Sequence, residues 1–165
     1  MNSKKLTWGL LAIYLLALTW VILLKLQFSF ETLDHLRNIN LIPFGDSAIT
    51  NGTIDFSEII YNTLAFIPFG IFLCVLGQRK SLLKMVGIIF LTSLSYEILQ
   101  YIFAIGGSDI TDLIANTLGG VIGIGIFFFL LRIFKEKTCK IINIVSLIAA
   151  IFLILLIAVL LLVNA

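Results

Sequence analysis

The amino-acid sequence predicts an all-α protein, a polytopic bundle of about five transmembrane helices that forms one membrane domain over residues 1–165. Three observations support this: the composition, the lengths of the apolar segments and the distribution of the cations. The chain is 61% hydrophobic and only 12% charged. Soluble domains are nearer half apolar, with about a quarter of their residues charged. So little polar surface cannot cover a globule in water, so we expect the lipid bilayer to surround the chain.

Five apolar segments are long enough, or nearly so, to cross a hydrocarbon core about 30 Å thick, which takes about 20 helical residues. They cover residues 6–24, 59–76, 85–105, 113–134 and 141–163. The first follows Lys4 and Lys5, as the apolar part of a signal peptide would. It is rather long for that role and no convincing small-x-small cleavage site follows, so we expect a retained helix.

The cations predict the orientation of the helices. Nine of the 11 lysines and arginines lie before the first segment or in the loops after the second and fourth: Lys4, Lys5, Arg79, Lys80, Lys84, Arg132, Lys135, Lys137 and Lys140. The other two, Lys25 and Arg37, lie in the long loop 25–58, among several acidic residues. The positive-inside rule then places the N-terminus in the cytoplasm and the C-terminus outside. We expect a multi-pass protein of the cell membrane, without a nucleic-acid partner.

The second and fourth segments begin alike. Each starts with an acidic residue followed, one helical turn later, by Asn-Thr-Leu: Glu58 precedes Asn62, and Asp112 precedes Asn116. The phrase suggests a weak internal repeat, with two chance matches as the alternative. Beyond Asn116, a Gly-x-x-x-Gly pattern at residues 119–123 predicts a seam where helices approach closely.

The third segment contains the sequence YEILQ, in which Glu97 and Gln100 share one helix face. Ser93 extends this face by a further turn. At a rise of 1.5 Å per residue, Glu97 lies about 13 Å from the outer edge of the bilayer, and Asn62 and Asn116 about 6 Å. All four polar groups in the membrane would then lie in its outer half. We expect them to converge on one chamber that opens to the outside.

Glu97 is the strongest single candidate for function. A carboxylate in hydrocarbon either finds a cation or takes up a proton, and no lysine or arginine lies in a helical segment at that depth. Arg37, in the long outer loop, is the nearest candidate partner. The alternative is a neutral glutamic acid that joins helices by hydrogen-bonding Gln100 or Asn62. A catalytic residue stays unknown, with Glu97 as the best candidate, because no Ser-His or Cys-His nucleophile pattern is present.

Both prolines of the chain, Pro43 and Pro68, occur in the tetrapeptide Ile-Pro-Phe-Gly. Pro68 falls in mid-membrane, where it removes a backbone hydrogen bond and leaves a carbonyl for neighbours or water to satisfy. Pro43 suits a segment at 40–44 that re-enters the outer leaflet and covers the chamber. An ordinary kink and an ordinary turn are the alternatives. The seven residues GGSDITD, 106–112, predict a sharp turn between the third and fourth helices.

The sequence predicts neither a metal site nor a cofactor. Cys74 lies in an apolar segment and Cys139 in a basic loop, so we expect no disulfide, and there is no CxxC or Cys/His cluster. His35, the one histidine, is expected to be a solvated loop residue.

Four motifs together resemble the VanZ-like family of bacterial membrane proteins. They are NLIPF at 40–44, NTLAFIPFG at 62–70, YEILQ at 96–100 and SDITDLIANTLGGVIG at 108–123, so the similarity covers about residues 38–125. The resemblance implies a cell-envelope protein linked to reduced susceptibility to teicoplanin-like and lipoglycopeptide antibiotics, without an agreed biochemical activity. The family tends to have an arginine where this chain has Gly106 and Gly107, and often an acidic residue in place of Thr111. Arg37 is therefore the candidate substitute for that arginine.

Three classes of function stay open from the sequence. The first is a chamber that binds an envelope component, lipid-linked or amphipathic and anionic. Its candidate binding residues are Arg37, Asn40, Asn62, Glu97, Gln100, Asp109, Asp112 and Asn116. The second is an intramembrane enzyme with Glu97 as general acid or base and a divalent cation at Asp109 and Asp112. The third is an assembly partner whose polar groups only join helices, and transport of a small solute is a further option. We expect binding rather than catalysis.

Overall fold

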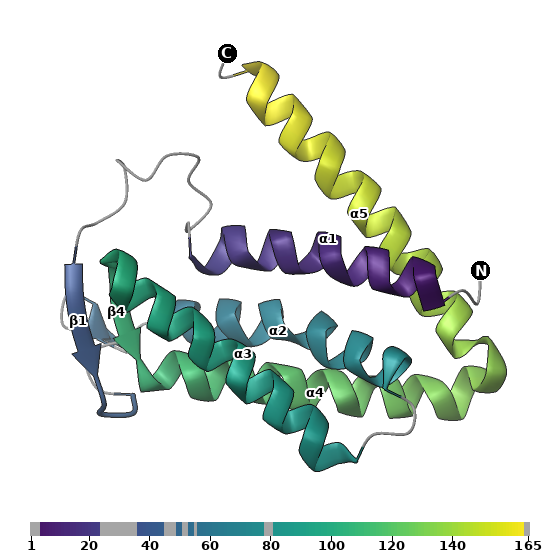
Figure 1. Cartoon of the computed structure of the whole chain (residues 1–165), viewed down its shortest axis with the longest axis horizontal. Coiled ribbons are helices and arrows are strands. Elements are labelled where there is room, and N and C mark those ends of the chain that lie inside the picture. Colours follow the sequence, from purple (N-terminus) through teal and green to yellow (C-terminus); the bar gives the residue numbers. More distant parts are fainter. Residues whose placement is uncertain are drawn as a thin grey trace.

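The computed structural model describes residues 4–23, 36–44, 49–50, 53–54, 56–77 and 81–163. Its elements, in chain order, are α1 (Lys4–Ile22), β1 (Leu36–Asn40), β2 (Ile49–Thr50), β3 (Thr53–Ile54), α2 (Ser57–Leu76), α3 (Leu82–Phe103), β4 (Ile105–Asp109), α4 (Ile110–Phe134), the short 3-10 helix η3 (Lys135–Lys137) and α5 (Thr138–Val163) (Figure 1). The predicted helical character is confirmed, with a small β component that the sequence did not indicate.

Several of these helices are long and apolar enough to cross a membrane. In the described part of the chain they are Lys4–Ile22, Ser57–Leu76, Leu82–Phe103 and the run Ile110–Leu162, which contains both α4 and α5. Five separate crossings, and their direction, stay a prediction. Helices α2, α3 and α4 begin two or three residues before the predicted segments. Polar caps explain two of these starts: the side chain of Ser81 accepts from the amide of Lys84, and that of Asp109 from the amide of Thr111.

The link between α3 and α4 is a strand and not the predicted seven-residue turn. Helix α3 ends at Phe103 and is capped by Ala104, which adopts the left-handed conformation (φ 55°), and residues 105–109 then form β4. Strand β4 pairs in parallel with β1, from Leu36 opposite Ile105 to Asn40 opposite Asp109. The turn prediction was wrong because the partner strand lies far away in the sequence, where local turn chemistry gives no signal.

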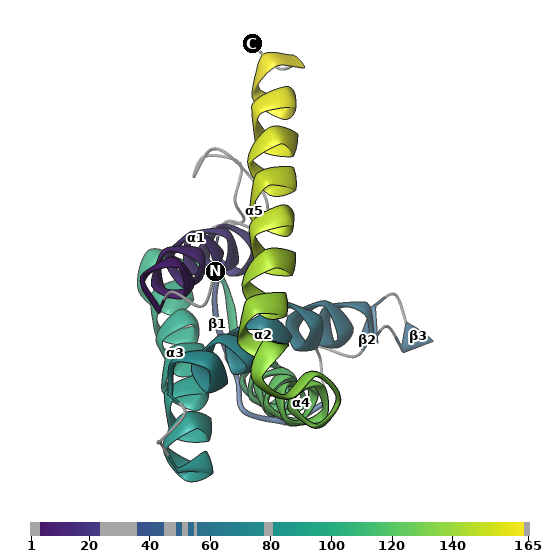
Figure 2. The ribbon, with the colours of Figure 1, turned by 90° about the vertical axis from the view of Figure 1, so that its right-hand side faces the viewer.

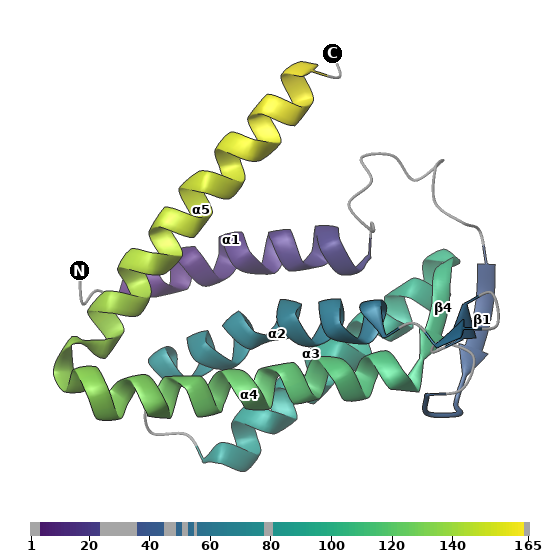
Figure 3. The ribbon, with the colours of Figure 1, turned by 180° about the vertical axis from the view of Figure 1, so that it is seen from behind.

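Helices α2 and α4 form the closest helix pair of the bundle. Both begin at the end where β1 and β4 lie, so they run parallel (Figure 3). A Cβ atom added to Gly119 would lie 2.0 Å from the carbonyl oxygen of Thr63, and one added to Gly123 would lie 2.0 Å from that of Ile67. The predicted packing role of the Gly119-x-x-x-Gly123 pattern is confirmed, because only glycine lets the two backbones touch here.

Helix α5 diverges from the other helices (Figure 2). It starts beside the N-terminal end of α1, where the buried hydroxyl of Thr7 donates to the side-chain oxygen of Asn143 over 3.0 Å. Further along, large apolar side chains such as Phe152 and Leu162 are exposed. The remainder of α5 therefore presents an apolar surface that suits lipid.

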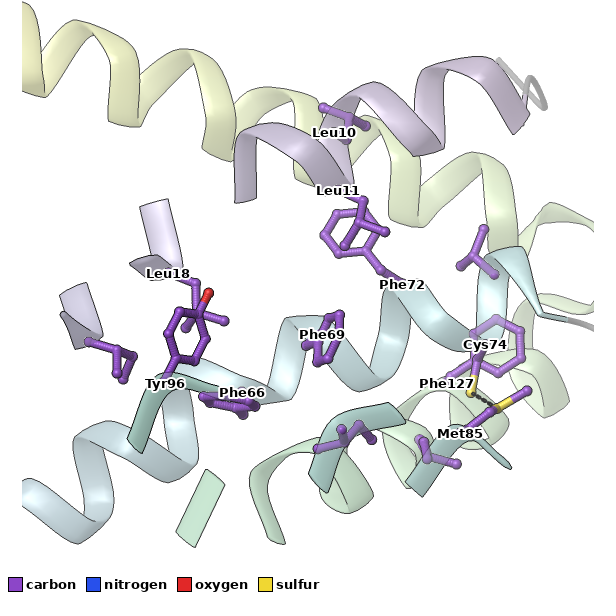
Figure 4. Packing of buried hydrophobic residues seen from close by; sticks show 14 of the residues in the cluster. Leu10, Leu11, Leu18, Phe66, Phe69, Phe72, Cys74, Met85, Tyr96 and Phe127 are labelled. Atoms are coloured by element: carbon purple, nitrogen blue, oxygen red, sulfur yellow. Dashed lines mark hydrogen bonds between the residues drawn. The ribbon is translucent and has the colours of Figure 1, made fainter. Parts of the chain in front are cut away.

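Aromatic side chains of α2 organise the core between the helices. Figure 4 shows Phe66, Phe69 and Phe72 of α2 packed among leucines of α1, with Tyr96 of α3 beside Phe66. The rings of Phe66 and Tyr96 meet edge to face with centroids 6.3 Å apart, an arrangement that aromatic pairs favour. In the same core the thiol of Cys74 lies 3.7 Å from the sulfur of Met85. Cys74 is buried, and Cys139 is partly buried.

Pro68 lies inside α2, and the helix continues through it. A proline donates no hydrogen bond to the carbonyl four residues earlier, which here belongs to Leu64. In the same turn, the hydroxyl of Tyr14 on α1 donates a hydrogen bond of 2.5 Å to the carbonyl of Ala65. A neighbouring helix thus bonds the carbonyl next to that of Leu64, and a partner for the Leu64 carbonyl itself stays a prediction.

Candidate functional site

A polar cavity of about 800 Å³ lies at the end of the bundle where α1 and α3 end and α2 and α4 begin. Five of the predicted site residues line it: Asn62 of α2, Glu97 and Gln100 of α3, and Asp112 and Asn116 of α4. The remaining lining residues are Val21, Ile22, Ser57, Glu58, Tyr61, Leu64 and Ala65. The structure therefore brings together side chains from three helices that the sequence assigned to one chamber.

Four polar side chains of the cavity wall, from α3 and α4, are deeply buried. Asn116 is 0% exposed, and the exposed fractions of Gln100, Glu97 and Asp112 are 5%, 6% and 8%. The amide nitrogen of Asn116 donates to the hydroxyl of Ser93 over 2.9 Å, and that of Gln100 donates to the backbone carbonyl of Ile22 over 3.1 Å. Both contacts join neighbouring helices, and both use the donor end of the amide.

The acceptor ends of these two amides remain unused. Within the part of the chain that the structure describes, Oε1 of Gln100 and Oδ1 of Asn116 are buried without a hydrogen-bond partner. A buried acceptor left in this state costs about 1–3 kcal/mol, so native proteins seldom leave one without a reason. Both residues line the cavity, where a bound group could supply the missing donors.

Glu97 connects α3 to the strand that follows it. Its carboxylate oxygen Oε2 accepts a hydrogen bond of 2.9 Å from the backbone amide of Asp109, and its own backbone carbonyl accepts one of 2.7 Å from the hydroxyl of Ser108. Gln100, one of the partners proposed for a neutral Glu97, donates to α1 instead. The carboxyl group also interacts electrostatically with three others, those of Asp112, Asp109 and Glu58.

The order of depth along the bundle is the reverse of the prediction. Asn116 bonds Ser93, which lies one turn further from the β4 end of α3 than Glu97 does, whereas Glu97 bonds Asp109 just before α4 begins. Glu97 is therefore nearer the end of the bundle than Asn116. Counting residues from a turn placed Glu97 too deep, because β4 runs back past the last turns of α3.

Asn40 and Asp109 lie outside the polar cavity. Their side chains bond each other, from Nδ2 of Asn40 to Oδ2 of Asp109 over 3.0 Å, and Oδ1 of Asp109 accepts from the amide of Thr111 over 2.7 Å. Both residues line a second recess, of about 280 Å³, whose other walls are mostly apolar, such as Leu94 and Ile98. Glu97 belongs to both linings.

The segment expected to cover the chamber lies beside this recess. Leu41 and Ile42 are 70% and 69% exposed, and the amide of Phe44 donates to the hydroxyl of Thr111 over 3.1 Å. None of residues 40–44 is among those that line the polar cavity in the described structure. The predicted re-entrant plug is therefore not found over the cavity, because contacts with β4 and the start of α4 hold this segment elsewhere.

The position of Arg37 is described only for its backbone, in β1 opposite Gly106 of β4. Its side chain, like residues 25 and 35, lies outside the described residues. The basic side chains that are described all belong to the ends of helices remote from the cavity (Figure 1): Lys4, Lys5, Lys84, Arg132, Lys135, Lys137 and Lys140. The predicted contact between Arg37 and Glu97, Asp109 or Asp112 stays a prediction.

A divalent cation at Asp109 and Asp112 gains no support from the geometry. Among the described residues, no three His, Cys, Asp or Glu side chains are grouped as a metal ion would require. Both carboxylate oxygens of Asp109 already accept hydrogen bonds.

Sequence reasoning missed the contribution of α1 to the cavity. Val21 and Ile22 lie in its lining, and the carbonyl of Ile22 is the acceptor for Gln100. An apolar residue near a helix end carries no signal that its backbone will receive a side-chain hydrogen bond. Only the packing of α1 against α3 could reveal this contact.

Comparisons with known proteins identify the family of the chain. The VanZ/LLP1 family model matches residues 11–135. The chain belongs to the VanZ/LLP1 family. It is 42% identical over 127 residues to Protein VanZ of Enterococcus faecium, a match that covers 76% of this chain and 75% of that protein. No solved structure matches the chain. The family range contains every residue that lines the polar cavity and the recess, whereas α5 lies beyond it.

Proposed function

We propose that this VanZ/LLP1 family member is a multi-pass protein of the bacterial cell membrane whose polar cavity binds an amphipathic, lipid-linked envelope component. By occupying or presenting that component, it lowers susceptibility to glycopeptide-type antibiotics such as teicoplanin. The observation that carries the proposal is the pair of buried acceptors, Gln100 Oε1 and Asn116 Oδ1, beside an open cavity. A purely structural network would satisfy its own acceptors.

The rim of the cavity supports an amphipathic ligand. Val21 of α1 and Tyr61 and Leu64 of α2 line the cavity and are 37%, 67% and 56% exposed. The cavity thus opens between side chains that suit hydrocarbon, while its inner wall is polar. A ligand with an apolar tail along the rim and a polar group against Glu97 and Asn116 fits both parts.

We propose that this cavity lies in the outer half of the membrane, because the distribution of the cations favours that orientation. We propose five crossings with the N-terminus inside, since the described basic side chains lie at the end remote from the cavity. An alkaline phosphatase fused to the C-terminus should be active, and a cytoplasmic reporter at the same site inactive. The opposite pattern would contradict the orientation.

The binding proposal is tested by an inventory of the lipids that co-purify with the full chain. The decisive variant is Glu97→Gln, since a glutamine oxygen can still accept from the amide of Asp109 and the fold should persist. The matched control is Glu136→Gln, which changes an exposed carboxylate of η3 outside the cavity. A lipid that accompanies wild type and the control, but not Glu97→Gln, is the expected result. Identical inventories for all three would refute the proposal.

An intramembrane enzyme is the second candidate, because the carboxyl groups of Glu97 and Asp112 face one cavity and interact electrostatically. Such a pair could divide general acid and base roles. An enzyme would retain the bound lipid in Glu97→Gln but stop its conversion, visible as an accumulated substrate in the inventory. An assembly partner would tolerate the substitution without either change.

A further inference from the structure

The polar cavity presents carboxyl groups and hydrogen-bond acceptors to its contents. Three carboxyl groups belong to its lining, those of Glu58, Glu97 and Asp112, each from a different helix. No lysine, arginine or histidine is among the described lining residues. Carboxylates can only accept hydrogen bonds when ionised, so this wall offers acceptors to a ligand.

Two amide side chains of the cavity wall also offer hydrogen-bond acceptors. Asn116 and Gln100 donate from their nitrogens to Ser93 and Ile22, and Oδ1 and Oε1 have no partner among the described residues. Both residues are more than nine-tenths buried, and both line the cavity. The sequence suggested an anionic ligand, but an anion would meet three carboxyl groups in the lining.

We propose that the cavity takes a primary ammonium, as the polar end of the amphipathic ligand. The proposal rests on the proposed function and specifies the chemistry of its ligand. An ammonium carries three N–H donors and one positive charge, which match two unused amide oxygens and the neighbouring carboxyls. A hydroxyl or sugar could satisfy the amide oxygens but could not form the charge-assisted hydrogen bonds with the carboxyl groups that an ammonium offers.

Three probes with one tail and different heads separate these cases: dodecylammonium, dodecanol and dodecyl phosphate, each added to the purified full chain in neutral maltoside micelles. The midpoint of thermal unfolding is measured against probe concentration, because a ligand of the native state raises stability in proportion to ln(1 + [L]/Kd). Dodecylammonium should raise the midpoint saturably, with a Kd at least about tenfold lower than either other probe, the equivalent of about 1.4 kcal/mol.

The outcomes distinguish this inference from the proposed function. If dodecyl phosphate or dodecanol binds as tightly as dodecylammonium, or more tightly, the assignment of an ammonium ligand is wrong, although the cavity remains a binding site. No saturable effect of any probe on wild type would overturn both. If dodecylammonium binds only to Arg37→Ala, the chain itself supplies the cation, and the inference again fails.

The effect of Glu97 is tested with the same probes. Glu97→Gln should raise the Kd of dodecylammonium at least about tenfold and leave the weaker binding of dodecanol as in wild type. Glu136→Gln should bind all three probes as wild type does. Unchanged ammonium binding in Glu97→Gln would overturn the assignment.

Carboxyl labelling provides a test on wild type that needs no variant. An apolar carbodiimide modifies accessible carboxyl groups, and mass spectrometry locates the modified residues. Dodecylammonium should protect Glu97 and Asp112 from labelling but not the exposed Glu136. Dodecanol should protect Glu97 and Asp112 less than dodecylammonium does. Equal labelling of Glu97 and Asp112 with and without dodecylammonium would overturn the inference.

Discussion

Helices α2 and α4 meet in two regions of opposite character. Along the glycine seam their backbones touch, and Gly119 and Gly123 leave no room for a Cβ atom. One turn closer to the helix starts, Asn62 and Asn116 line a cavity of about 800 Å³ with unused acceptors. The contrast teaches that a rigid, dry contact can support an adjacent polar site, because the seam holds the two helix starts at a set separation.

The largest effect is expected at the seam. Gly119→Ala would bring Cβ to 2.0 Å from the carbonyl oxygen of Thr63, a contact that only a backbone shift can relieve. Overpacking of this kind costs about 1–3 kcal/mol and occasionally more, and we expect the upper end. Gly125→Ala is the matched control on the same helix, since nothing lies within 4 Å of its added Cβ. Unfolding in micelles measures both, and equal stabilities would mean that the seam does not set the helix spacing.

The second prediction concerns charge at the cavity end. We expect Arg37 to form a charge-assisted pair with Glu97, Asp109 or Asp112. If Glu97 is that partner, Arg37→Ala should impair antibiotic protection about as much as Glu97→Ala, and the double variant should be less than additive. The ammonium proposal narrows the partner to Asp109, which lines the recess and not the cavity.

A double-mutant cycle between Arg37→Ala and Asp109→Asn checks this partner and should give a coupling of about 0.5–3 kcal/mol. Strictly additive effects, with Arg37→Ala like wild type, would show instead that the guanidinium reaches lipid headgroups.

A smaller effect is expected at the inner wall of the cavity. Ser93→Ala removes the acceptor for the amide nitrogen of Asn116, and hydrogen bonds between membrane helices average about 0.6 kcal/mol. Ser95→Ala is the control on the same helix, because its exposed hydroxyl bonds the carbonyl of Leu91 four residues earlier. Loss of stability in Ser93→Ala alone is the expected result. Equal losses would mean that the Ser93–Asn116 contact does not join α3 to α4.

The grouping of these site residues could be predicted because it depends on local features of the sequence. Asn62, Glu97, Gln100, Asp112 and Asn116 are polar residues near the ends of apolar helices, and hydrocarbon penalises such groups unless they face one another. The sequence could therefore indicate that they converge, although it could not say what they bind. The seam at 119–123 followed from the same logic, since small residues in a membrane helix mark close packing.

The sequence by itself determined the helices and the clustering of their polar faces, because hydrophobic length and helical spacing act within a few turns of the chain. Only the tertiary structure decided the rest. The pairing of β1 with β4 joins residues 36–40 to 105–109, moves Glu97 to the level of Asp109 and draws residues 40–44 to the apolar recess. The carbonyl of Ile22 likewise became a partner of Gln100 through packing alone. Each of these contacts connects distant segments, and their energies depend on the assembled fold rather than on any local pattern.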